Sequence, residues 1–102
     1  MEVQVDSEPV DGSVAVRVVV HLTPRELTRV FVAGDVLLHL PADGLVDDVG
    51  ECPMPRTSMF LSEMAELRDG YLRVFADRAS ADAYAADVRA QLEQAASRMR
   101  TA

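Results

Sequence analysis

Two groups of residues in this chain have types and spacing that could support chemistry. The first is the lone cysteine, Cys52, which follows Glu51 and precedes Pro53 and Pro55 in the sequence ECPMP. A reactive thiol needs a neighbouring positive charge or a histidine base that stabilises the thiolate. The run that leads into Cys52 is acidic instead and disfavours a thiolate. We therefore interpret Cys52 as an ordinary cysteine in a connector at residues 50–57.

The second group consists of three aspartates and a histidine spaced four residues apart. On one unbroken helix this spacing would align three carboxylates and an imidazole along a single face, a donor set suited to a divalent ion. Pro41 and Gly44 oppose such a helix. A solvated acidic face is the preferred interpretation, and a metal site is the alternative; its residues would be Asp35, His39, Asp43 and Asp47.

Other catalytic signatures are missing from the sequence. It contains no glycine-rich phosphate loop, no paired-cysteine zinc spacing and no G-x-S-x-G elbow. We expect a protein that is not an enzyme and that carries no cofactor.

Length and charge limit the classes of partner. The 102 residues fit one small domain, and the formal charge of −7 comes from 17 acidic against 10 basic side chains. An acidic chain repels phosphate backbones, so nucleic-acid binding is not expected. A single cysteine, an N-terminus without a basic signal region and the lack of a long apolar run predict a cytoplasmic protein without a membrane segment.

All ten basic residues are arginine, and lysine, isoleucine and asparagine are absent. These three amino acids have AT-rich codons. The composition therefore indicates a GC-rich source, such as an actinobacterium or one of its phages.

The N-terminal third alternates in the manner of a β-hairpin. Apolar side chains occupy every second position from Val14 to Leu22, and the Asp11-Gly12 pair before them is typical of a tight turn. We predict an antiparallel hairpin with strands at roughly 2–7 and 13–22.

A short helix is predicted next. In the sequence TPRE, Thr23 can cap the helix, Pro24 fits its first position, and Glu26 can return a hydrogen bond to complete a capping box. Leu27, Val30 and Phe31 would form its apolar stripe. Residues 29–40 fit either more helix or a second hairpin around Ala33-Gly34-Asp35.

The same region resembles the opening of the helix-turn-helix domains that end many response regulators, in the six residues LTPREL (Leu22–Leu27). The resemblance implies a turn and a basic recognition helix next, and a sequence-specific DNA-binding regulator is therefore an alternative function. The chain instead continues with apolar and then acidic residues, and it has no arginine from Val30 to Pro55. The capping box alone accounts for the six residues.

The second half is predicted to be mainly helical. One helix would begin with Thr57 or Ser58 as its cap and end near Gly70, and YLRVFA would form a short strand. A long alanine-rich helix capped by Ser80 would follow, with Ala81, Tyr84, Ala85, Val88, Leu92, Ala95 and Met99 on one face. The expected class is α+β.

These features favour a small acidic accessory or regulatory protein that acts by protein–protein contact. Its partner would present a basic surface, and a homodimer is also expected because the core is poor in aromatic residues. The predicted acidic contact residues are Asp43, Asp47, Asp48 and Glu51. The predicted self-contact residues, for which the core is the alternative location, are Tyr84, Val88 and Leu92.

Overall fold

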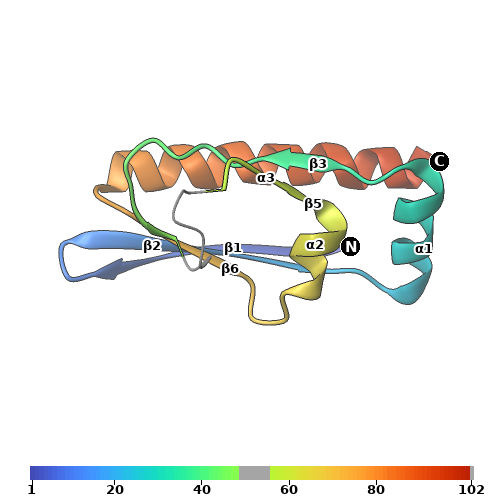
Figure 1. Cartoon of the computed structure of the whole chain (residues 1–102), viewed down its shortest axis with the longest axis horizontal. Helices are drawn as coiled ribbons and strands as arrows, with labels where there is room; N and C mark the ends of the chain where they lie inside the picture. Colours follow the sequence, from blue (N-terminus) through green and yellow to red (C-terminus); the bar gives the residue numbers. More distant parts are fainter. Residues whose placement is uncertain (49–55, 102) are drawn as a thin grey trace.

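The predicted hairpin forms the N-terminal edge of a four-stranded sheet in the computed structural model, which describes residues 1–48 and 56–101 (Figure 1). Strand β1 (Glu2–Val10) pairs antiparallel with β2 (Ser13–His21), so both strands are close to their predicted ranges. Asp11 and Gly12 connect them with φ values of 45° and 83°, which are the positive angles of a type I′ turn.

The sheet has the order β1-β2-β6-β4, and the fold is α+β, as predicted. Strand β6 (Tyr71–Phe75) confirms the short strand predicted in the second half. Strand β4 (Leu45–Asp48) pairs antiparallel with β6 and contains a bulge after Leu45. A separate two-stranded ribbon consists of β3 (Leu37–His39) and β5 (Ser58–Phe60). Strands β4 and β5 were not predicted from the sequence, whereas β3 lies in the segment that the alternative hairpin around Gly34 assigned to a strand.

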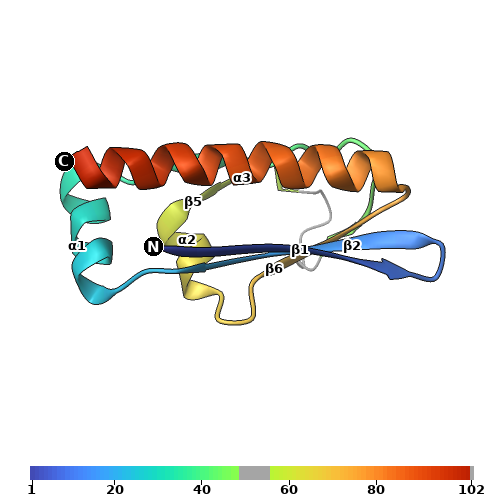
Figure 2. The ribbon, with the colours of Figure 1, turned by 180° about the vertical axis from the view of Figure 1, so that it is seen from behind.

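Helix α3 (Arg78–Thr101) runs along one face of the sheet (Figures 1 and 2). Its predicted apolar face is confirmed, because Ala81, Tyr84, Val88, Leu92 and Ala95 are buried together with the inward-facing valines of β2. The predicted cap was wrong. The helix begins two residues before Ser80, and the carboxylate of Asp77 accepts a hydrogen bond of 2.8 Å from the backbone of Ser80.

Helix α1 (Pro24–Ala33) begins with the predicted capping box. The hydroxyl of Thr23 accepts from the Glu26 backbone at 3.2 Å, and the Glu26 carboxylate accepts from the Thr23 backbone at 2.9 Å. The helix continues to Ala33, so the alternative hairpin around Gly34 was wrong. Strand β3 follows α1 where a helix-turn-helix would require a second helix.

Helix α2 (Leu61–Glu66) begins later than predicted. The predicted helix started at Thr57 or Ser58, but Ser58–Phe60 forms strand β5 instead. The reason is non-local pairing: these three residues lie opposite Leu37–His39, and a long-range partner overrides the local preference for helix.

A buried arginine joins the sheet to the ribbon. Arg73 of β6 has no exposed surface, and its guanidinium donates to the carbonyls of Pro41 at 3.0 Å and Arg56 at 2.6 Å. The guanidinium carbon also lies 5.3 Å from the ring centroid of Tyr84 and 5.7 Å from that of Tyr71, within cation–π range. Pro41 closely follows β3 and Arg56 closely precedes β5, so Arg73 holds both strands of the ribbon.

Within the ranges 1–48 and 56–101, no helix is both long enough and apolar enough to cross a membrane.

We expect the substitution Arg73→Met to lower the free energy of unfolding by about 3 kcal/mol, because it leaves two buried carbonyls without their charged donor. Urea denaturation followed by circular dichroism measures this change. Arg68→Met, at an exposed arginine, is the control and should change stability by less than about 0.5 kcal/mol. An equal loss in both variants would contradict the assigned role of Arg73.

Candidate protein-contact site

Four large apolar side chains are exposed around the end of the molecule that contains α1. We call Phe31, Val32, Leu37 and Phe60 the apolar patch; their exposed fractions are 63%, 84%, 58% and 44%. Leu37 and Phe60 are direct partners across the β3–β5 ribbon, so their side chains emerge side by side on its outer surface. Two of the three phenylalanines in the chain are thus exposed here. Large apolar side chains that are exposed in this way are typical of contact sites.

The connector between α1 and β3 is fixed in place by Asp35. The Asp35 carboxylate accepts hydrogen bonds from the Val36 backbone at 2.9 Å and from both the backbone and the hydroxyl of Ser62 in α2. The Leu61 backbone N–H also donates to the Val36 carbonyl at 2.8 Å. These contacts set the position of the α1 end relative to the ribbon.

Strand β3 is held from its other side by α3. The side-chain amide of Gln91 accepts from the His39 N–H at 2.7 Å and donates to the His39 carbonyl at 2.8 Å. This amide satisfies the backbone as a neighbouring strand would. The ribbon that presents Leu37 is therefore bound both to α3, through Gln91, and to the sheet, through Arg73.

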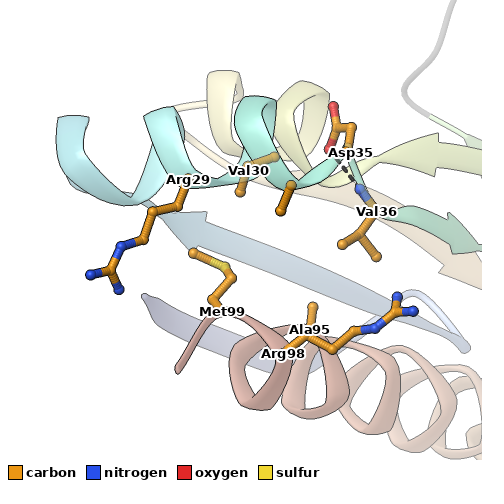
Figure 3. Close-up of a pocket in the computed structure, with 9 residues that line it drawn as sticks. Arg29, Val30, Asp35, Val36, Ala95, Arg98 and Met99 are labelled. Atoms are coloured by element: carbon orange, nitrogen blue, oxygen red, sulfur yellow. Dashed lines mark hydrogen bonds between the residues drawn. The ribbon is translucent and has the colours of Figure 1, made fainter. Parts of the chain in front are cut away.

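A groove of about 300 Å³ lies beside the apolar patch, between α1 and the last turns of α3 (Figure 3). Its apolar surface comes from Val30, Ala33, Val36, Ala95 and Met99, and Arg29 and Arg98 stand on opposite sides of it. We call this the α1–α3 groove. Its volume is at the lower end of the range for ligand pockets, large enough for one or two side chains. It combines an apolar floor with two positive charges and with Asp35, whose carboxylate is hydrogen-bonded to Val36 and Ser62.

Three carboxyl groups have pKa values below their ordinary range. The N-terminal ammonium lowers the pKa of Glu26, and the Phe60 backbone and then Arg56 lower that of Glu63. Hydrogen bonds from Ser80 lower the pKa of Asp77. Each group serves a helix start, and Glu26 also binds the chain terminus. These shifts are explained by structural roles and not by catalytic ones.

The proposed metal ligands do not lie on one helix. Asp35 is in the connector after α1, His39 in β3, Asp43 in a turn and Asp47 in β4. The single helical face that the metal alternative required is therefore absent, as Pro41 and Gly44 indicated, because the chain forms strands there. In the part of the chain that the structure describes, no group of three or more candidate ligands could hold a metal ion.

The predicted acidic contact residues belong to several parts of the chain. Asp43 is exposed in the turn before β4, where Gly44 has a φ of 77° and a side chain would collide with Ser80. Asp47 and Asp48 belong to β4, an edge strand of the sheet. Glu51 and Cys52 lie outside the described residues.

The predicted self-contact residues form part of the core. Tyr84, Val88 and Leu92 have exposed fractions of 1%, 0% and 1%, and the Tyr84 ring centroid lies 4.8 Å from that of Phe75. They cannot contact a second copy without unpacking α3 from the sheet. The alternative considered for them, a place in the core, is correct.

The sequence analysis missed the apolar patch and assigned Phe31 to the buried stripe of α1. In the structure only Val30 of that helix is fully buried. A signal was present: Val30, Phe31 and Val32 are consecutive, and three consecutive residues span too much of a helix to face one core. The chemistry of the site is thus apolar contact beside basic charge.

Comparison of the chain with protein-family models, with curated proteins and with solved structures found no match.

We expect the protein to lose stability as pH falls from about 5 to about 3, because carboxyl groups whose pKa is lowered by folding stabilise the protein only while ionised. Their contribution is complete above the unfolded pKa and disappears as pH falls through the folded pKa. In Glu63→Gln one such group no longer titrates, so the acid-induced loss should be shallower than in the wild type.

Urea unfolding at a series of pH values measures this slope. Glu66→Gln, an exposed glutamate in the same helix, is the matched control and should reproduce the wild-type slope. If Glu63→Gln also reproduces it, the assigned hydrogen bonds of Glu63 do not contribute to stability.

Proposed function

We propose that this protein is a non-enzymatic accessory or regulatory protein that acts by contact with another protein, through the apolar patch. The observation that carries the proposal is the exposed Leu37–Phe60 pair on the ribbon, together with Phe31 and Val32 in the last turns of α1. A small protein gains nothing in stability by exposing two of its three phenylalanines. Burial against a partner would recover that apolar area.

The way in which the patch is held supports the same function. Binding surfaces are most effective when the contact residues are fixed before the partner arrives, because less conformational entropy is then lost. Arg73, Gln91 and Asp35 each attach a different part of the patch to the core through hydrogen bonds. Aromatic side chains presented in this manner are typical of interface hot spots.

Charge selects among partners. The patch adjoins Arg29 and Arg98, so a partner for this end should be acidic as well as apolar, whereas the acidic residues near β4 would face a basic surface. The cytoplasm, a reducing compartment, suits a chain with one cysteine.

The test is a binding assay with partners captured from the source organism and identified by mass spectrometry. The variant Val32→Gln/Phe60→Thr keeps helix and strand preferences while removing apolar surface, and we expect it to weaken binding at least about 30-fold, the effect of losing roughly 2 kcal/mol at a hot spot.

Leu67→Gln, at an exposed leucine just after α2, is the matched control and should weaken binding less than about threefold. Asp47→Arg/Asp48→Arg tests the acidic surface. If this reversal abolishes binding while Val32→Gln/Phe60→Thr leaves it intact, the apolar patch is not the contact site.

A further inference from the structure

The two ends of the molecule's longest dimension, which is 42 Å, carry different sets of exposed charges; α1 and the last turns of α3 lie at one end, and the β1–β2 turn and the start of α3 lie at the other (Figures 1 and 2). Where α1 meets the last turns of α3, four of the ten arginines are exposed; they are Arg25, Arg29, Arg98 and Arg100. The opposite end contains the β1–β2 turn and the start of α3. Its exposed carboxylates are Glu8, Asp11, Asp43, Asp77 and Asp82, of which Asp82 pairs with Arg78.

The turn between β1 and β2 exposes an apolar side chain close to two carboxylates. Val10 is 42% exposed at the end of β1, and the exposed carboxylates of Glu8 and Asp11 lie on either side of it in the sequence. We call residues 8–11 the hairpin tip. An apolar side chain flanked by two acids is complementary to the α1–α3 groove, which has an apolar floor flanked by two arginines.

We infer that a second copy of this chain occupies the α1–α3 groove with its hairpin tip. The complementary surfaces are at opposite ends of one molecule, so a copy lying antiparallel to the first satisfies both contacts at once. Such an arrangement is a closed dimer with twofold symmetry, in which each contact strengthens the other. The inference rests on the proposed function, since it uses the end of the molecule that contains the apolar patch.

In this dimer, the basic surface that an acidic protein is expected to bind is the α1–α3 groove of the second copy. Arg29 can donate two parallel hydrogen bonds to a carboxylate, a geometry that a lysine could not supply, and Arg98 adds a second positive charge. The contact combines ion pairs with the burial of Val10 against Val36 and Met99, which line the groove and are only partly buried. The affinity of the dimer should therefore decrease as the salt concentration rises. The apolar contact contributes to this affinity independently of charge.

Light scattering on the purified full chain tests the inference. At low salt we expect twice the chain mass of 11.1 kDa, with a dissociation constant that rises at least about tenfold from 50 to 500 mM salt. Two variants are decisive. Arg29→Glu/Arg98→Glu makes both ends acidic, and Glu8→Arg/Asp11→Asn reverses the hairpin tip while keeping a residue that tolerates the positive φ.

Each variant alone should be a monomer, and an equimolar mixture of the two should restore a dimer, because each now supplies the charge that the other lacks. Glu66→Arg/Asp69→Asn produces the same change in net charge as the tip variant at a distant site and should remain a dimer. Circular dichroism confirms that each variant is folded.

A wild-type protein that is monomeric at every salt concentration would overturn the inference, as would a dimer that survives both charge changes. A mixture that stays monomeric would overturn it too. In each of these cases, a different protein whose binding requires Val32 and Phe60 would still support the proposed function. Failure of the dimer inference can therefore be distinguished from failure of the proposed function.

Discussion

The buried guanidinium of Arg73 positions the surface on which the proposed function rests. It is the one charged side chain among the described residues that lies wholly in the core, and it reaches from β6 to the carbonyls of Pro41 and Arg56. These carbonyls lie at the end of β3 and before the start of β5. The ribbon they bound has three residues in each strand, too few to be stable alone. Its stability must come from this anchor, from Gln91 and from the burial of Leu38 and Met59 in the core.

The apolar patch follows from the same constraint. In a three-residue strand the central side chain faces the core and the outer ones face outwards, so burial of Leu38 and Met59 requires exposure of Leu37 and Phe60. The ribbon could have carried polar residues at the outer positions. Its large apolar pair, next to Phe31 and Val32, is therefore best explained by contact with another molecule.

Much of the fold could be predicted from local sequence. The alternation in β2 with its Asp-Gly turn, the capping box at Thr23 and the apolar face of α3 are local patterns, and the structure contains each of them. The ribbon could not be predicted in this way, because three-residue strands have no periodicity and their partners are 19 to 23 residues apart in the sequence. For the same reason the start of the helix predicted at Thr57 or Ser58 was wrong, although helix α2 does form from Leu61.

The site was harder to predict than the fold. The acidic composition favoured Asp43 and its neighbours as contact residues. The exposure of Phe31 and Phe60 could not be predicted from composition, because it depends on tertiary packing. One clue was local: Tyr71, Arg73 and Phe75 alternate along a strand whose inner face is buried, which places Arg73 in the core. The net charge of −7 likewise concealed a basic end, because composition has no spatial information.

The central claim is that the end of the molecule containing α1 is a contact surface. The most direct measurement is the concentration dependence of the backbone amide signals in nuclear magnetic resonance spectra of the labelled protein. We predict that dilution shifts the amides of α1, of Leu37 and Phe60, of the last turns of α3 and of the hairpin tip, and leaves those of β6 and α2 unchanged. Shifts confined to other surfaces would contradict the assignment of this end as a contact surface. The absence of shifts, both on dilution and on addition of an identified partner, would contradict it as well.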